Sequence, residues 1–175
     1  MIYKIKKGRH YCNFKMPRLH NGPDELNFTV IFDKSCSYKL DTPDDLDVNK
    51  LYGISYAHVH QDSIRIGWNI DPATELEPER IALYLYTYNN EIRKYSYLAS
   101  CDYNKPVKIS FNFDYASNLV YVTLNPVYIE NHLSKRVFYK ESFIYPKIKV
   151  GYYNKVYFGG TSKSPSDMKI AIFED

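Results

Sequence analysis

The sequence predicts an all-β protein, a sandwich or barrel of about ten to twelve short antiparallel strands with little helix. Short runs of alternating apolar and polar residues recur along the chain, separated by Pro, Gly, Asn and Asp, which is typical of half-buried strands. No 11-residue window combines the 3.6-residue period of a helix with helix caps. Nothing divides the 175 residues into two units, so we expect one β-sandwich domain over residues 1–175.

The expected strands are bounded by turn-forming residues. Residues 8–25, the acidic segment DTPDDLD (41–47) and DPATELEPE (71–79) are expected to be loops, the last with one short helical turn. The acidic segment lacks the ligand spacing and glycine of an EF-hand loop. The expected strands cover residues 2–6, 26–33, a hairpin over 50–70, a second hairpin over 80–100, and residues 107–113, 119–124, 137–145, 148–153 and 168–172.

Composition excludes several classes of function. The 23 basic and 20 acidic residues nearly balance at a net charge of +3, which argues against nucleic acid as a partner. No apolar run approaches the roughly 18 residues of a membrane span, and MIYKIKKGRHY lacks the apolar region of a signal peptide. We therefore expect a soluble protein with no membrane partner. Three widely spaced cysteines without a CxxC pattern predict reduced thiols.

The first hairpin, KLYGISYAHVHQDSIRIGWNI (50–70), carries two of the five histidines and the one tryptophan. If Gln61-Asp62 forms a two-residue loop, His58 pairs with Arg65 and Tyr56 with Gly67, which places His60 on the same face as Arg65. The opposite face is apolar and is expected to be core: Ile64, Ile66 and Trp68, beside Ala57 and Val59. Gln-Asp is not a favoured turn pair, and a one-residue slip would exchange the faces, so the other register stays open.

The second hairpin repeats this design with tyrosine, of which the chain has 19. A two-residue loop at Asn89-Asn90 would pair Tyr86 with Arg93 and Tyr84 with Tyr95. One face would then carry a tyrosine–arginine stripe that is suited to binding a partner. The alternative is that these rings only stack to cover a sheet face.

A metal site at the histidines is not expected. His58 and His60 would point the same way on a strand, as two ligands of one metal do. No third ligand is placed to complete such a site, and a neighbouring Arg65 would disfavour a cation. We therefore predict no metal and no cofactor.

Landmark segments suggest a known fold. They are KGRHY (7–11), FDKSC (32–36), the first hairpin, and KVYFGGTSKSPSDMKIAI (155–172). The last resembles the closing pattern YFGG…P.DM.I.I of concanavalin-like (laminin-G-like) jelly-roll sandwiches. The order as a whole resembles small uncharacterised proteins of tailed bacteriophages and gut bacteria. The resemblance implies an antiparallel jelly-roll β-sandwich in which a glycan or partner binds the concave sheet face. Gly159-Gly160 would form a tight turn before the last strand.

A second resemblance concerns KVGYYNK (149–155), which is similar to the YFKAG.YNQ strand of alginate lyases. Lyases on jelly rolls use a Tyr with a His or Gln as acid and base, and an Arg that neutralises the uronate. His60, Gln61, Arg65 and a tyrosine would take these roles. The chain lacks the R.E.R strand of that family, and KVGYYNK departs from the pattern at important positions, so an enzyme is not the leading hypothesis.

The leading hypothesis is a non-enzymatic binding or structural module: a bacteriophage virion accessory protein of capsid or tail that contacts other virion proteins or a surface glycan. Its expected location is the virion or the host cytoplasm, with a homo-oligomer left open. One alternative is a carbohydrate-binding or polysaccharide-lyase-like jelly roll that uses its concave face, and another is an intracellular phage protein that sequesters a small host metabolite. The candidate binding residues are Tyr56, His58, His60, Arg65, Tyr84, Tyr86, Arg93 and Tyr95.

Overall fold

The computed structural model of the protein describes residues 1–13, 16–56, 58–71, 79–129, 132–134 and 136–175. Its helices are two short 3-10 turns, η1 (Lys34–Cys36) and η2 (Pro43–Leu46), and no helix in these ranges is long and apolar enough to cross a membrane. The strands are β1 (Ile2–Ile5), β2 (Leu19–Asn21), β3 (Glu25–Phe32), β4 (Asn49–Ser55), β5 (Ser63–Ile70), β6 (Ile81–Asn89), β7 (Ile92–Cys101), β8 (Val107–Asp114), β9 (Leu119–Asn125), β10 (Val127–Ile129), β11 (His132–Ser134), β12 (Val137–Ser142), β13 (Val150–Tyr153) and β14 (Met168–Glu174).

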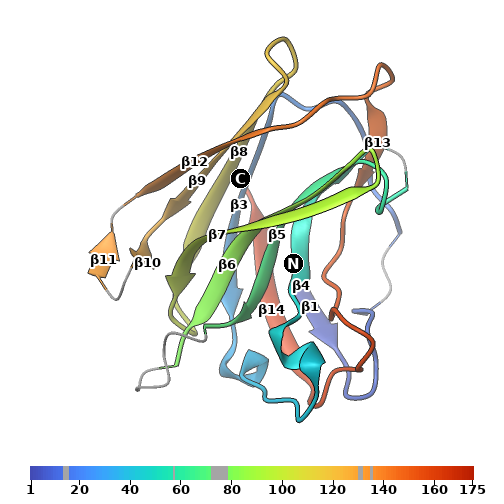
Figure 1. Cartoon of the computed structure of the whole chain (residues 1–175). Coiled ribbons are helices and arrows are strands. Elements are labelled where there is room, and N and C mark those ends of the chain that lie inside the picture. The colour runs from blue at the N-terminus through green and yellow to red at the C-terminus, as the bar shows by residue number, and fades with distance from the viewer. Residues whose placement is uncertain (14–15, 57, 72–78, 130–131, 135) are drawn as a thin grey trace.

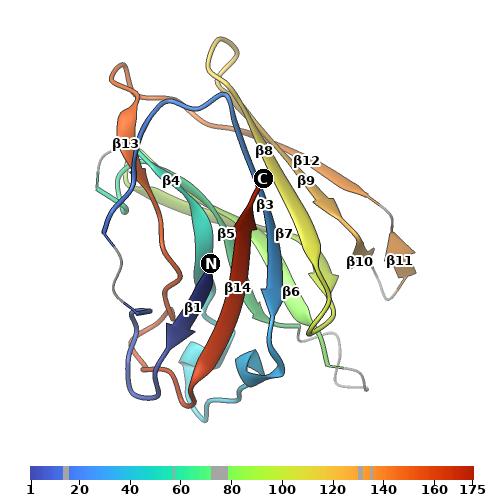
Figure 2. The same ribbon diagram turned by 180° about the vertical axis from the view of Figure 1, so that it is seen from behind.

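The strands form two antiparallel sheets that pack against each other (Figure 1). The six-stranded sheet has the order β1-β14-β3-β8-β9-β12, and the eight-stranded sheet the order β11-β10-β7-β6-β5-β4-β13-β2. The view from behind shows the six-stranded sheet in front, with β14 between β1 and β3 (Figure 2). The predicted all-β sandwich is confirmed. The three-residue strands β2, β10 and β11 were not expected, because three residues are too short to display an alternation.

The core lies between the sheets, as the alternation predicted. Leu26, Phe28, Val30 and Phe32 point inward from β3 and are buried. Trp68 is fully buried, with its ring 5.4 Å from that of Phe32. Burying side chains of this size stabilises a fold by about 1.5–3 kcal/mol each. Ile64, Ile66 and Trp68 are therefore core residues, as expected.

The β6–β7 hairpin has the predicted faces with a shifted turn. Asn90 and Glu91, with φ of 50° and 66°, form the two-residue loop, so Asn89 pairs with Ile92. Positive φ at both loop positions suits the twist of a two-residue hairpin. The shift moves the register by two residues, and Tyr86 faces Tyr95 where Arg93 was expected. An even shift keeps the side chains between Tyr84 and Tyr97 on their predicted faces. The register shifts again between Leu83 and Tyr84, so Ala82 pairs with Ser100 and not with Tyr97.

The β4–β5 hairpin corrects the prediction. Its last pair is Ser55 with Ser63, so the loop covers residues 56–62 and Gly53, not His58, faces Arg65. At residues 53–55 this register differs from the expected one by an odd number, which exchanges the faces of that part of the first strand. An irregularity between Lys50 and Gly53 shifts the register again, and Lys50 pairs with Gly67. Tyr56 accordingly belongs to the core cluster, 6% exposed, and is not on the face of Arg65. Ala57 lies outside the described residues.

Two loop predictions have different outcomes. Gly160 adopts φ 70°, a conformation that suits glycine, before the last strand, as expected. The acidic segment 41–47 contains η2, whose Asp44 accepts hydrogen bonds from the backbone of Thr161 and Ser162. These two hydrogen bonds hold the turn at Gly160 against η2. The helical turn expected in 71–79 falls on residues 72–78, outside the described part.

Candidate functional site

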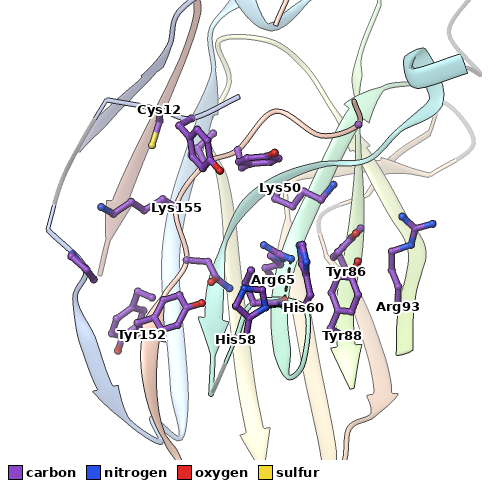
Figure 3. Close-up of a pocket in the computed structure, with 18 of the residues that line it drawn as sticks. Cys12, Lys50, His58, His60, Arg65, Tyr86, Tyr88, Arg93, Tyr152 and Lys155 are labelled. Atoms are coloured by element: carbon purple, nitrogen blue, oxygen red, sulfur yellow. Dashed lines mark hydrogen bonds between the residues drawn. The ribbon is translucent and has the colours of Figure 1, made fainter. Parts of the chain in front are cut away.

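A cavity of about 900 Å³ opens on the face of the eight-stranded sheet that points away from the core, here called the open face. Its floor is formed by neighbouring strands: Lys50 of β4, Arg65 of β5, Tyr86 of β6 and Arg93 of β7 (Figure 3). The walls come from the β4–β5 loop, from β13 and the residues after it, and from the N-terminal segment. Together with Asp47 after η2 and Tyr88 of β6, these segments contribute the lining side chains Tyr11, His58, Val59, His60, Tyr152, Tyr153, Asn154, Lys155 and Tyr157.

The β4–β5 loop brings the two histidines to this cavity. The loop folds back on itself because Gln61 N–H donates to the His58 carbonyl and the Ser63 hydroxyl donates to the Val59 carbonyl. The rings of His58 and His60 are 5.3 Å apart, and His60 packs 5.1 Å from Tyr88. The histidines therefore approach Arg65 through the loop and not through strand pairing. No group of three metal-ligating side chains exists among the described residues.

Arg65 is buried at the base of the cavity with few partners. It is 5% exposed, and its guanidinium lies 5.2 Å from the centre of the Tyr86 ring. Its Nη2 makes one long hydrogen bond, 3.5 Å, to the Val59 carbonyl, and its Nε has no partner within the described structure. Gly53 makes room for it, because a Cβ at that position would lie 2.6 Å from Cβ of Arg65.

Lys50 adds a second cation beside Arg65. Its ammonium lies 5.0 Å from the centre of the Tyr86 ring. Burial, together with the charge of Arg65, lowers the pKa of Lys50 to about 8, and burial also lowers the pKa of Arg65. Burial and the same positive charges lower the pKa of His60. These shifts have a common cause, a concentration of positive charge that is partly removed from water.

Acidic compensation at the cavity is small. Lys50, Arg65 and Arg93 take part in none of the ion pairs found among the described residues. Asp47 lines the cavity and attracts Lys50 electrostatically, but the two do not form an ion pair. Among the described lining residues, Lys50, Arg65, Arg93 and Lys155 outnumber the carboxylate of Asp47, so the cavity is a cationic site.

Asn154, which also lines the cavity, has a second unpaired donor. Asn154 follows β13 and is 4% exposed, with its Oδ1 accepting a hydrogen bond from Ser55. Its Nδ2 has no partner in the described part of the chain. A buried donor without an acceptor is unfavourable by about 1–3 kcal/mol. Asn154 and Arg65 therefore both offer N–H groups that an incoming acceptor would satisfy.

The structure brings together some of the predicted site residues and separates others. His58, His60, Arg65, Tyr86 and Arg93 line the cavity. Tyr84 and Tyr95 lie on the same open face but outside the cavity lining, in ring contact with each other at 6.1 Å. Tyr56 is a correction, because the longer loop sends its ring into the core against Phe143 and its hydroxyl to Tyr115.

Several lining residues were missed by the sequence reasoning. Lys50 was placed at the start of a strand with no role, and Asp47 was read as part of a solvated loop. Tyr152 and Asn154 had a signal, since KVGYYNK was singled out as similar to a lyase strand. Tyr11 and Tyr157 lie in segments without alternation, and only the tertiary structure brings them into contact, with ring centres 5.1 Å apart.

Comparison with known proteins supports the fold. The alginate lyase from Klebsiella pneumoniae matches with a TM-score of 0.57 at 10% identity, over 86% of this chain and 59% of that chain. The CBM40 of Ruminococcus gnavus IT-sialidase matches with a TM-score of 0.36 at 13% identity, over 87% and 77%. This chain thus spans less than two thirds of the lyase. No protein-family model and no curated protein sequence matches it.

The match to the lyase bears on the predicted fold and not on the predicted function. At 10% identity the likeness to the lyase is one of fold alone, and it agrees with the expected β-sandwich. The expected relation to bacteriophage and gut-bacterial proteins gains no support. A virion role, a homo-oligomer and carbohydrate binding therefore all remain hypotheses.

Proposed function

We propose that the protein binds an acidic polysaccharide at the cavity of the open face. The observation that carries this proposal is the pair of buried Arg65 and half-buried Lys50, two cations without an ion-pair partner in the described structure. A sugar carboxylate supplies the missing charge and acceptor oxygens for the unpaired N–H of Arg65 and Asn154. The likeness in fold to an alginate lyase supports a glycan as the source of the carboxylate.

The tyrosines support a sugar over a small free anion. Tyr86, Tyr88 and Tyr152 line the cavity together with the cations (Figure 3). A tyrosine ring offers a flat apolar surface to a sugar ring, and its hydroxyl remains available for hydrogen bonds. A cavity of about 900 Å³ is large enough for more than one sugar residue.

Binding of defined oligosaccharides tests this proposal. Calorimetric titration should detect a hexauronate and not a neutral hexasaccharide of equal length. Arg65→Met should weaken binding at least tenfold, because a buried charge-assisted hydrogen bond contributes about 1.5–3 kcal/mol. Lys108→Met is the matched control, since it removes one positive charge from an exposed position on the other sheet. Equal binding of the charged and neutral oligosaccharides would refute the proposal.

A second candidate is cleavage of the bound polysaccharide by β-elimination. The observation that favours it is His60, whose lowered pKa makes it a neutral base beside Arg65, with Tyr152 lining the same cavity. The base would take the proton from the carbon next to the carboxylate. Electrons of that C–H bond would form a C=C bond, and the glycosidic C–O bond would break as its oxygen accepts a proton from a tyrosine hydroxyl.

An absorbance assay separates binding from cleavage. Elimination creates an unsaturated uronate that absorbs in the ultraviolet, so a lyase should produce a steady increase with a polyuronate. His60→Ala should abolish that increase and leave oligosaccharide binding within about twofold of the parent protein. Absence of any increase across a panel of acidic polysaccharides would leave the protein as a binding module.

A further inference from the structure

The open face carries a row of tyrosines that continues beyond the cavity. Ring contacts link Tyr88 to Tyr86 at 5.9 Å, Tyr86 to Tyr95 at 6.2 Å, and Tyr95 to Tyr84 at 6.1 Å. Tyr97 completes the row, 5.8 Å from Tyr84. Tyr86 and Tyr88 belong to the cavity lining, whereas the other three lie outside it. We call Tyr84, Tyr95 and Tyr97 the tyrosine track.

The track is accessible, and its length suits a polymer. Tyr95 and Tyr97 are 51% and 47% exposed, which is high for large rings on a sheet face. Tyr84 and Tyr88 stand four residues apart on one strand, so the row extends about 14 Å along it. A sugar bound in the cavity would therefore direct the rest of its chain over these rings.

The charge of the face changes along the row. The cavity end holds Lys50, Arg65 and Arg93. At the track end, buried Asp71 accepts a hydrogen bond from Ser100, whose hydroxyl also bonds that of Tyr97 at 2.8 Å. Burial, and then the charge of Asp71, raise the pKa of Tyr84. Burial raises the pKa of Tyr97; Asp71 adds to this increase, and the Ser100 hydrogen bond and the charge of Arg80 oppose it. Asp71 therefore acts on the hydroxyls of Tyr84 and Tyr97 in the sense opposite to the cations of the cavity, and Arg80 offsets part of its effect at Tyr97.

We propose that the tyrosine track is a separate subsite for uncharged sugar residues of the same polysaccharide whose carboxylate binds in the cavity. This inference rests on the proposed function. A second uronate would be repelled at the track by Asp71, while a neutral sugar offers hydroxyls that donate to tyrosine oxygens and an apolar face that stacks on their rings. The ligand is then a heteropolysaccharide that combines acidic and neutral sugars, not a homopolymer of uronates.

Three ligands test this assignment by calorimetric titration: a diuronate, a hexauronate, and a hexasaccharide in which uronates alternate with neutral hexoses. The mixed hexasaccharide should bind more tightly than the hexauronate. Tyr95→Ala and Tyr97→Ala should each weaken the mixed hexasaccharide by about three- to tenfold, the scale of one aromatic contact. Neither should change diuronate affinity by more than about twofold.

Two further variants sharpen the test. Tyr121→Ala is the matched control, because Tyr121 is a strand tyrosine on the six-stranded sheet, stacked on Phe138. It should leave all three affinities unchanged. Asp71→Asn removes the negative charge and should let the hexauronate approach the affinity of the mixed hexasaccharide. Circular dichroism of each variant establishes that it is folded.

The outcomes distinguish this inference from the proposed function. Equal affinity for the two hexasaccharides, or track variants that bind them as the parent protein does, would overturn the subsite and leave acidic-glycan binding intact. Failure of all three ligands to bind would overturn the proposed function, and the subsite with it.

Discussion

Lys50 and Arg65 define the chemistry of the open face at the scale of single residues. Each is a cation whose pKa is lowered, first by burial. Removing a charge from water is unfavourable unless a partner compensates for it. Their positions are therefore difficult to explain by stability, since an apolar residue would serve the fold better. Recruitment of an anion accounts for both.

Lys50 makes the proposed binding dependent on pH. Its pKa of about 8 means that the ammonium loses its proton as the pH rises through 8, more than two units below the ordinary range for lysine. We expect affinity for a hexauronate to fall between pH 7 and pH 9, as measured by titration calorimetry. The bound carboxylate raises this pKa, so the decline in affinity should extend upward from pH 8.

Two variants at the same position control that experiment. Lys50→Arg keeps a positive charge throughout this range and should bind with little dependence on pH. Lys50→Met should bind weakly at every pH. A decline that persists unchanged in Lys50→Met would assign the titration to a different group.

The β4–β5 hairpin determines, at the scale of elements, where Arg65 points. Gly53 faces Arg65 across the strands, and the missing side chain allows the backbones to approach closely. A β-carbon at Gly53 would lie 2.1 Å from the Ile64 carbonyl oxygen and 2.4 Å from Cα of Arg65. Neither backbone atom is free to move within the sheet.

Gly53→Ala should therefore disturb both the fold and the site. We expect a loss of about 1–3 kcal/mol in the free energy of unfolding, the usual effect of overpacking, measured by urea denaturation. Hexauronate binding should weaken as Arg65 is displaced. Gly8→Ala is the control, with no atom within 4 Å of the new carbon and φ of 74°; it should lose about 1 kcal/mol from backbone strain and retain binding. Full binding by Gly53→Ala would contradict the role given to this glycine.

His20 lies on β2, the edge strand of the eight-stranded sheet that pairs with β13, and its ring reaches β4. Its Nε2 is 3.1 Å from the Ser55 carbonyl of β4, and its Nδ1 accepts a hydrogen bond from Gly22 N–H. β2 also pairs with β13, which carries Tyr152. Burial lowers the pKa of His20, so the imidazole is neutral in the folded protein at pH 7.

Stability should decrease in mild acid because of this histidine. Its pKa is about 6.5 in the unfolded chain and lower in the folded one. The unfolded state therefore takes up the proton first as the pH falls below 6.5, and the free energy of unfolding declines until the folded pKa is passed. Urea midpoints at pH 8 and pH 5 should show this difference. His20→Gln, which cannot titrate, should show a smaller difference; an equal one would exclude His20 as the cause.

At the scale of the whole molecule, the eight-stranded sheet carries the core on one face and the proposed binding site on the other. Trp68 points into the core, where its ring contacts Phe32 and Tyr38. Arg65, three residues earlier on β5, points to the open face. Side chains on the open face can therefore be replaced to change the proposed binding without removing contacts in the core.

Ligand binding should stabilise the whole protein, with Trp68 as the reporter. It is the single tryptophan and is fully buried, so its emission should follow unfolding of the sandwich and not occupancy of the cavity. A hexauronate at 100 times its dissociation constant should add about 2.7 kcal/mol to the free energy of unfolding. The thermal midpoint from Trp68 emission should rise by several degrees in the parent protein. At the same hexauronate concentration the tenfold weaker Arg65→Met should gain no more than about 1.4 kcal/mol, so its midpoint should rise by about half as much or less. A rise with the neutral hexasaccharide would indicate a different kind of ligand.

Much of the fold was predictable because alternation is a local property. Phe28 and Val107 could be assigned to the core from the alternation within their own strands. Tyr84 and Tyr86 lie on their predicted face although the turn of their hairpin is shifted by one residue. The β4–β5 register was not predictable. The length of that loop depends on hydrogen bonds such as Ser63 to Val59, which no propensity of Gln61-Asp62 reveals.

The sequence by itself determined that this chain forms an antiparallel β-sandwich with an aromatic and cationic sheet face, because the period of a strand assigns each side chain to a face. The tertiary structure decided which of those residues share one cavity. It placed Lys50 beside Arg65, brought Asn154 and Tyr157 to the opposite wall and moved Tyr56 into the core. Such a grouping arises from strands distant in the chain, and a periodic pattern carries no information about which of them become neighbours.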